Sequence, residues 1–371
     1  MIDAGDLRCG AERTGLYFPF LKDKKVAIVC NHTSLIGQAH LVDSLIGAGI
    51  HVSSIFSPEH GFRGNAEAGA EINDDHDNKT GIRLISLYGK KKKPLPEDLA
   101  GIDLLLFDIQ DVGVRFYTYI STLALVMEAA ADAGIPLILL DRPNPNGFYV
   151  DGPVLDTNFR SFVGMHAVPV VYGMTIGEYA IMINEEGWLA GKKCNLSVVP
   201  VEGYNHNMLV KLKEKPSPNL PDWKSVYLYP SLCFFEGTMI SVGRGTDYPF
   251  QVFGHPDYLA GSFMFTPVSI SGVAEKPLCE GRVCYGANLN GFAENFIANE
   301  NHLNLGWLIG MHQYFRDSAD FFNPYFDKLA GNDNLRNDLI SGKTENEIRE
   351  SWQSDLDRFR MIRKKYLLYP D

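Results

Sequence analysis

The chain has 371 residues, of which 45% are hydrophobic and 21% are charged, and its formal net charge is −11 at pH 7. This length allows two domains with sizeable cores, and the composition excludes an extensively disordered chain. An acidic surface repels phosphate backbones, so no nucleic-acid partner is expected. No apolar run reaches the roughly 20 residues that a membrane-spanning helix needs, so no membrane span is expected.

The residues Met1 to Thr14 are polar and contain no apolar signal core. We therefore expect a cytoplasmic protein, or a periplasmic or secreted one if a signal peptide was removed upstream. The only basic block, Lys90 to Lys93, is interpreted as a solvated loop. Among the six cysteines, Cys279 and Cys284 are closest in sequence, but no pair has the CxxC spacing that is typical of a zinc site.

The first 190 residues alternate short apolar runs with helical patterns. Strands are predicted at 25–31, 51–57, 83–87, 102–109 and 135–140, and helices at 41–49, 119–133 and 175–188. Thr175 and Glu178 have the spacing of a capping box at the start of the last helix. Continuous apolar strands separated by helices are typical of a parallel sheet covered on both faces. We predict a Rossmann-like α/β domain over residues 1–190.

The pattern changes in the second half of the chain. A strand is predicted at 194–201, followed by a proline-rich stretch at 216–221. Further short strands are predicted around 227–229, 238–242 and 281–285, and helices at 302–316 and 345–365. Mixed short strands followed by helices favour a smaller α+β auxiliary domain over residues 191–371.

Polar segments follow four of the predicted strands, and they cover residues 31–34, 57–61, 108–115 and 141–147. Ligands of open α/β sheets bind beyond the carboxyl ends of the strands. Each such residue alone is more often a helix cap or a turn, but four segments at one edge favour a functional site. We therefore expect one cleft that contains Asn31, Glu59, Gln110, Asp111 and Arg142.

The residues at these strand ends indicate the kind of ligand. The segment after the first strand reads NHTSLIG, and neither GxGxxG nor GxxxxGK[ST] is present, so we predict no dinucleotide, no ATP and no other cofactor or metal. HExxH, GxSxG and SxxK are also absent. Carboxylates, amides, arginines and tyrosines together suit a sugar, because polar groups bind its hydroxyls and aromatic faces cover its ring.

Glu59 is the principal catalytic candidate. Pro58 restricts the backbone before it, and Gly61 permits a sharp turn after it. An acid on such a loop is suited to general acid catalysis, and the alternative is a helix N-cap. His60 is either catalytic or orients Glu59. Asp111 is a second carboxylate or a turn residue, Asp108 is expected to be structural, and Asp141 and Arg142 are a candidate ion pair.

Several motifs resemble those of the exo-β-N-acetylmuramidase family (NamZ-like, glycoside hydrolase family 171). They are CNHTS (30–34), SPEHGFRG (57–64), FDIQDVGVRFYTYIST (107–122) and LDRPNPNG (140–147). VYGMTIGE (171–178), SPNLP (217–221) and residues 229–254 continue the resemblance, which covers nearly the whole chain. It implies a Rossmann-like catalytic domain and an auxiliary domain that closes the active-site cleft.

The resemblance also implies an activity, the release of terminal non-reducing β-1,4-linked N-acetylmuramic acid (MurNAc) from peptidoglycan saccharides such as MurNAc-GlcNAc. It places the presumed catalytic glutamate at Glu59, and His60, Asp111 and Glu236 are candidates for the second group. The sequence gives no distance between two carboxyl groups, so retaining and inverting outcomes both stay open.

Substrate-binding candidates follow from the chemistry of this sugar. The lactyl carboxylate of MurNAc calls for a cation, and the candidates are Arg63, Arg142, Arg115 and Arg244. The other candidates are Asn31, Gln110, Tyr117, Asp141, Asn144 and Tyr172. A non-catalytic two-lobed sugar-binding protein is the alternative. A third interpretation is a Mg²⁺-dependent phosphatase in which Asp108 and Asp111 hold the metal.

Overall fold

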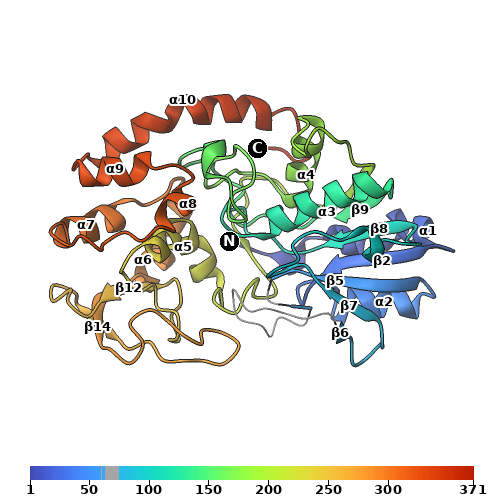
Figure 1. The fold of residues 1–371 in the computed structure, drawn as a ribbon, viewed down its shortest axis with the longest axis horizontal. Coiled ribbons are helices and arrows are strands. Elements are labelled where there is room, and N and C mark those ends of the chain that lie inside the picture. The colour runs from blue at the N-terminus through green and yellow to red at the C-terminus, as the bar shows by residue number, and fades with distance from the viewer. Residues whose placement is uncertain (60, 63–74) are drawn as a thin grey trace.

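The structure is a computed structural model of residues 1–371, and it describes residues 1–59, 61–62 and 75–371. His60 and Arg63 therefore lie outside the described residues. Two halves lie side by side along the longest axis (Figure 1), and the first of them holds the large sheet. The helix α10 (Glu345–Arg363) runs along the top of the second half in this view and ends near the junction of the two halves.

The large sheet has the strand order β10-β9-β8-β2-β5-β7-β6. Six of these strands are parallel, and only β6 is antiparallel to its neighbour. Numbered along the chain, the six parallel strands have the order 3-2-1-4-5-6 of dinucleotide-binding Rossmann folds. The predicted α/β class is confirmed. The strands are β2 (Lys25–Cys30), β5 (His51–Ser57), β6 (Asp75–His76), β7 (Arg83–Ser86), β8 (Leu104–Asp108), β9 (Leu137–Leu140) and β10 (Leu196–Val199).

Each face of this sheet packs against its own helices, because successive side chains of a strand point to opposite faces. Ala27 and Val29 of β2 belong to the core under α3 (Tyr119–Ala133) and α4 (Ile176–Glu185). Val26 and Ile28 belong to the opposite core, under α1 (Phe18–Leu21) and α2 (Leu41–Gly47). The bounds predicted for β5 and α3 match the structure.

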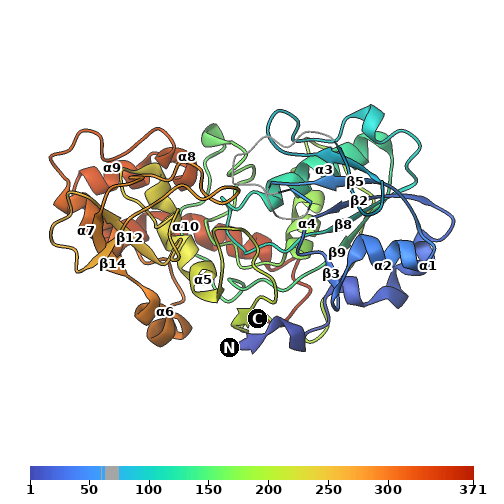
Figure 2. The same ribbon diagram turned by 90° about the horizontal axis from the view of Figure 1, so that it is seen from below.

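The ends of the chain attach to the segment that follows the large sheet. β1 (Ile2–Asp3) pairs with β11 (Val210–Lys211), and the backbone N–H of His206 donates to Pro370 O at 2.9 Å. Figure 2 shows both termini close together below the junction of the two halves. The predicted boundary at residue 190 falls before β10, so the large sheet continues beyond it.

The second half contains a three-stranded antiparallel sheet of order β12-β14-β13 and most of the remaining helices. Its strands are β12 (Val252–His255), β13 (Phe263–Phe265) and β14 (Cys284–Asn288). Its helices are α5 (Trp223–Leu232), α6 (Asn290–Phe296), α7 (Gly306–Tyr314), α8 (Phe326–Ala330), α9 (Asn334–Ile340) and α10. The short strands β3 (Leu35–Ile36) and β4 (Ala39–His40) form a separate hairpin in the first half.

Two strands that we predicted in the second half are absent from the described structure. Residues 227–229 belong to α5, whose N-cap Asp222 accepts a hydrogen bond from the N–H of Ser225. A short apolar run fits a buried helix as well as a strand, and here the cap decides for the helix. Residues 238–242 make only isolated bridges, through Thr238 and Ser241. The strand predicted at 281–285 overlaps only the start of β14.

The capping box predicted before α4 is confirmed. The N–H of Glu178 donates to Thr175 Oγ1 at 3.2 Å, and the N–H of Thr175 donates to Glu178 Oε2 at 2.9 Å. Across the described ranges, we find no helix that is long and apolar enough to span a membrane.

Candidate active site

A cavity of about 590 Å³ lies between the two halves of the molecule. The loops after β5, β7 and β8 contribute one wall, and segments of the second half contribute the other. Four of the predicted site residues line it, namely Glu59, Tyr117, Glu236 and Arg244. It is also lined by Tyr88, Lys92, Phe116, Thr118, Phe162, Asn219, Tyr229, Phe250, Tyr325 and Lys328.

Glu59 stands on the loop after β5, against the start of α3. Thr118 Oγ1 donates a hydrogen bond of 2.6 Å to Glu59 Oε2. The Tyr119 hydroxyl donates to the backbone oxygen of Glu59 at 3.4 Å, and Asn31 Nδ2 donates to that hydroxyl at 2.9 Å. The loop is thereby held by residues that follow β2 and β8. No described residue donates a hydrogen bond to the second carboxylate oxygen, Glu59 Oε1.

Glu236 enters the cavity from the second half, in a 3₁₀ turn (Cys233–Gly237) that directly follows α5. Arg244 Nε donates to Glu236 Oε1 at 2.6 Å, and the Arg244 guanidinium lies 4.9 Å from the centroid of the Phe250 ring. Burial disfavours a charged guanidinium, but the Glu236 carboxylate more than offsets this, so the pKa of Arg244 lies above its ordinary value.

The turn that carries Glu236 packs tightly against α8. A Cβ atom at Gly237 would lie 2.4 Å from the Cα atom of Phe326, which is closer than two carbon atoms can approach. Glycine at this position therefore permits the contact between the turn and α8 that fixes the backbone beside Glu236.

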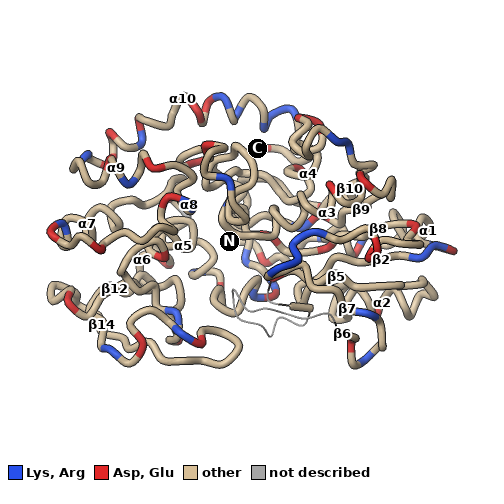
Figure 3. The backbone as a smooth tube through the Cα atoms, in the orientation of Figure 1, with Lys and Arg blue, Asp and Glu red and all other residues tan. Residues whose placement is uncertain are grey.

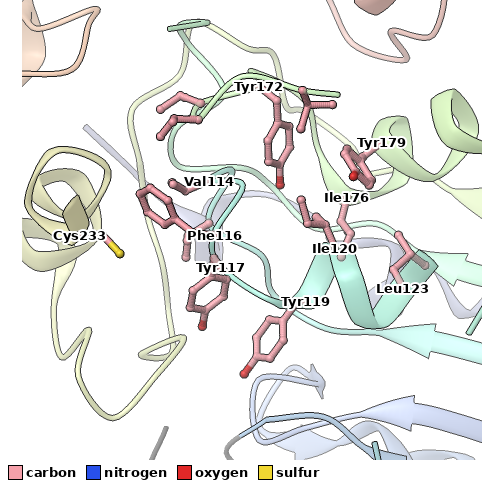
Figure 4. Close-up of a cluster of buried hydrophobic side chains, with 14 of the residues drawn as sticks. Val114, Phe116, Tyr117, Tyr119, Ile120, Leu123, Tyr172, Ile176, Tyr179 and Cys233 are labelled. Carbon is pink, nitrogen blue, oxygen red and sulfur yellow. The ribbon is translucent and has the colours of Figure 1, made fainter. Parts of the chain in front are cut away.

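Aromatic side chains from both halves line the cavity. In Figure 4, Tyr117 and Tyr119 lie next to each other, and Cys233 approaches Phe116 and Tyr117 from the other half. The Tyr117 hydroxyl donates to Pro216 O at 2.7 Å, so this group binds the protein itself. Burial raises the pKa of Tyr325, and the nearby Cys233, Glu236 and Glu59 raise it further. The Tyr325 phenol thus lies within the electrostatic reach of both carboxylates.

Two lysines at this cavity, Lys92 and Lys328, make no ion pair with any described residue. The two residues that flank Lys92 do form ion pairs: Lys91 pairs with Asp98, and Lys93 pairs with Glu128. Lys92 Nζ lies 4.5 Å from the centroid of the Phe162 ring. The basic block appears in Figure 3 as a continuous blue stretch of the tube. The block is a loop without helix or strand, as predicted, and Lys92 within it also lines the cavity.

Asp111 does not line the cavity. It is 3% exposed, and it accepts hydrogen bonds from the Tyr172 hydroxyl and, at 2.7 Å, from the N–H of Gly113. Burial raises the pKa of Asp111 to about 6, although these hydrogen bonds oppose the shift. Asp111 and Tyr172 therefore form a buried pair, although both were predicted to contact substrate.

Asp141 and Arg142 do not pair with each other. Arg142 forms two bonds to Asp108, Nε to Oδ1 at 2.5 Å and Nη2 to Oδ2 at 2.9 Å. Asp141 instead accepts hydrogen bonds from the hydroxyls of Thr175 and Tyr369 at 2.7 and 2.6 Å. Burial raises the pKa of Asp141 to about 7. The candidate Asp141–Arg142 ion pair was wrong, because Asp108 on the neighbouring strand takes the guanidinium.

Arg115 and two predicted amide residues also serve the fold. The Arg115 guanidinium donates to four backbone oxygens, those of Pro153, Val168, Leu329 and Ala330, at 2.7–2.9 Å. It thereby links the first half to α8. Gln110 Nε2 donates to Asp111 O and Pro143 O, and Asn144 Nδ2 donates to Met174 O.

The predicted convergence of five strand-end residues was therefore largely wrong. Glu59 lines the large cavity, whereas Gln110 and Arg142 line a separate cavity of about 80 Å³ next to the N-terminal segment. Asn31 reaches the large cavity only indirectly, through Tyr119 and the Glu59 loop. In the part of the chain that the structure describes, no group of three or more His, Cys, Asp or Glu side chains could hold a metal ion.

Sequence reasoning missed Thr118, Lys92, Tyr325 and Lys328 as cavity residues. Thr118 lies within the motif FDIQDVGVRFYTYIST and Lys92 within the basic block, so each had a local signal. Tyr325 and Lys328 flank the start of α8, and no motif marks them.

The protein joins a Rossmann-like sheet to an α+β half, and the cavity between them is lined by two carboxylates, aromatic rings and cations. These are features of an enzyme that hydrolyses sugars. Comparison with known proteins specifies the class. The N-terminal family model of exo-beta-N-acetylmuramidase NamZ matches residues 26–224, and the C-terminal model matches residues 227–369. The chain belongs to the exo-β-N-acetylmuramidase NamZ family and is a glycosidase.

Individual relatives agree with this assignment. The peptidoglycan beta-N-acetylmuramidase NamZ of Bacillus subtilis (strain 168) is 37% identical over 370 residues, which cover 94% of this chain and 88% of that protein. A crystal structure of a DUF1343 family protein from Bacteroides fragilis NCTC 9343 has a TM-score of 0.91 at 44% identity, and the match covers 99% of each chain. A second DUF1343 protein from that organism has a TM-score of 0.81 at 29% identity, over 98% of this chain and 99% of that one.

Proposed function

We propose that this glycosidase releases terminal non-reducing β-1,4-linked MurNAc from peptidoglycan fragments such as MurNAc-GlcNAc. The observation that carries the proposal is the presence of Glu59 and Glu236, one from each half, at a single cavity in a chain of this family. Most glycosidases use two carboxyl groups on either side of the scissile bond.

Glu59 is the proposed general acid. A sugar hydroxyl leaves poorly unless its oxygen is protonated as the bond breaks. Thr118 occupies Glu59 Oε2, which leaves Oε1 available to deliver a proton to the glycosidic oxygen. Asn31 and Tyr119 act behind it as positioning residues, because they hold the backbone of the Glu59 loop.

Glu236 is the proposed second carboxylate. Arg244 holds Glu236 Oε1 at 2.6 Å, so a negative charge is kept at the cavity at little electrostatic cost. Such a charge stabilises the positive, oxocarbenium-like transition state of glycoside cleavage. Because Arg244 is already paired, the cations that remain for the lactyl carboxylate among the described residues lining the cavity are Lys92 and Lys328. The Phe162 ring lies beside Lys92, and the Tyr325 ring also lines the cavity; such rings can cover the apolar faces of a sugar.

The test compares two disaccharides that differ only in the order of their sugars. The purified chain is incubated with MurNAc-GlcNAc and with GlcNAc-MurNAc, and the free sugars are separated and quantified by mass spectrometry. We expect release of MurNAc from the first disaccharide and no cleavage of the second. Equal cleavage of both would contradict exo-action on MurNAc, and binding without cleavage of either would favour a sugar-binding protein.

A further inference from the structure

A loop of the second half carries a pair of cysteines that the proposed catalytic site does not use. The loop joins β13, which ends at Phe265, to β14, which starts at Cys284. Cys279 lies near the end of this loop and is half-buried, whereas Cys284 is buried. Both side chains pack in one small apolar cluster with Val252 and Phe265.

The local backbone folds Cys279 back onto β14. Residues 279–282 form a tight turn in which the N–H of Arg282 donates to Cys279 O at 3.0 Å. Cys279 has a φ of 63°, in the left-handed region that non-glycine residues seldom adopt. The Cys284 thiol donates to Arg282 O at 3.9 Å, and its proximity to Cys279 in the same cluster lowers the pKa of Cys279. Cys279 is therefore the better nucleophile of the pair, because the thiolate is the reactive form.

The other four cysteines have the opposite properties. Cys9, Cys30, Cys194 and Cys233 are buried. Burial raises the pKa of Cys9 and of Cys194 to about 11 in each case, so thiolate is scarce at both. Partial exposure combined with a neighbouring thiol is thus specific to Cys279 among the six cysteines.

We propose that Cys279 and Cys284 form a thiol–disulfide redox site, which closes to a disulfide by exchange with a small or protein disulfide. The Cys279 thiolate attacks one sulfur of the oxidant, and the other sulfur of the oxidant leaves as a thiolate. Cys284, after losing its proton to solvent, then attacks Cys279 Sγ and displaces the second oxidant sulfur. Two cysteine thiols lose two electrons and two protons, and one oxidant disulfide becomes two thiols.

Closing this bridge would affect one wall of the large cavity. Within the same loop, the N–H of Val268 donates to Gly245 O at 2.9 Å, directly after Arg244 in the chain. Asn219, which lines the cavity, donates from Nδ2 to Val273 O at 2.8 Å. A disulfide at the base of the loop would fix the segment on which both contacts depend. The redox chemistry itself does not depend on the proposed catalytic roles.

Peptide mapping tests the proposal directly, because Arg282 lies between the two cysteines and trypsin cleaves after arginine. The native full chain is treated with glutathione disulfide, unfolded, alkylated, and digested without reduction. We expect two peptides joined by the Cys279–Cys284 bond, which separate on reduction, and four other cysteines that are alkylated. In the reduced native protein, iodoacetamide should modify Cys279 at least about ten-fold faster than Cys194.

Cys279→Ser and Cys284→Ser are the matched variants, and neither should yield the joined peptides. The oxidised wild type should have a higher Tm than the reduced protein, and this difference should vanish in both variants. Recovery of both cysteines as free thiols after oxidation would overturn the proposal, as would a stable glutathione adduct on Cys279 alone. If either variant fails to fold, the wild-type peptide map still decides.

Discussion

Two polar regions of this protein have similar composition and opposite character. At the carboxyl ends of the central strands, Asp108, Asp111 and Asp141 are buried and are bonded to Arg142, Tyr172 and Tyr369, respectively. At the cavity between the halves, Glu59 and Glu236 are partly exposed. Thr118 donates to one oxygen of Glu59, whereas Glu236 accepts from Arg244 at Oε1 and from the Cys233 thiol, at 3.6 Å, at Oε2. An acidic residue after a strand therefore indicates a ligand site only where its hydrogen bonds are not already used within the protein.

The termini explain why the first of these regions is closed. The N–H of Gly10 donates to Asp141 O at 2.8 Å, and a Cβ atom at Gly10 would lie 2.4 Å from Val199 O. From the other end of the chain, Tyr369 bonds to Asp141. The crevice where many Rossmann folds bind a ligand is thus covered by the protein's own N-terminal and C-terminal segments, which leave the small cavity beside Gln110 and Arg142. The site lies instead where the Glu59 loop faces the second half.

The largest expected effect is on catalysis by Glu59→Gln. The amide keeps the size of the side chain but cannot donate the catalytic proton, so kcat on MurNAc-GlcNAc should fall by about 10²–10⁴-fold. An aryl glycoside with an acidic phenol needs little protonation and should be affected much less. Stopped assays on both substrates measure this difference. A variant with near-normal kcat on the disaccharide would exclude Glu59 as the acid and leave Glu236 as the leading candidate.

Arg142→Met should affect stability and not chemistry. The substitution leaves the Asp108 charge buried without its partner, which typically costs about 3–5 kcal/mol of the free energy of unfolding. The double variant Arg142→Met/Asp108→Asn should recover part of this loss, because no unpaired charge remains. Urea unfolding measures the free energies, and kcat of the folded variant should stay within about two-fold. A tenfold loss of kcat at unchanged stability would return Arg142 to the catalytic site.

Asp111 should make stability depend on pH. Its pKa in the folded protein is raised to about 6, so it contributes most stability below its unfolded pKa of about 4 and loses this contribution as pH rises through 6. Asp111→Asn cannot titrate. Relative to wild type, its free energy of unfolding should therefore improve by up to about 3 kcal/mol between pH 4 and pH 7. A constant difference between the two proteins over this range would contradict the buried titration.

The smallest effect is expected for anion recognition by Lys92. Lys92→Met keeps an unbranched side chain that is one atom shorter and removes the charge at the cavity. It should lower kcat/KM for MurNAc-GlcNAc by about ten-fold, equivalent to about 1.4 kcal/mol. Lys93→Met is the matched control, because Lys93 pairs with Glu128 and Asp132 instead of lining the cavity. Equal losses in the two variants would mean that Lys92 does not bind the substrate.

The sequence by itself determined most of the local structure of the first half. Apolar periodicity located β5 and α3 with their observed bounds, and the Thr175–Glu178 spacing located the start of α4. These features depend on residues close together in the chain, so a local pattern is enough to predict them. The polar segment after the second strand also identified Glu59, and the resemblance to the family added Glu236 as a candidate; both line the cavity.

Only the tertiary structure decided which polar residues face the cavity. Glu59 and Glu236 line one cavity, as do Lys92 and Lys328, across separations in sequence that no local pattern encodes. Whether a carboxylate after a strand is exposed or buried depends on what covers it, and Asp141 is covered by Gly10 and Tyr369 from opposite ends of the chain. Hydrogen bonds within the fold compete with a ligand for the same carboxylate oxygens. Packing between distant segments decides whether an oxygen is bonded within the protein or stays available to a ligand.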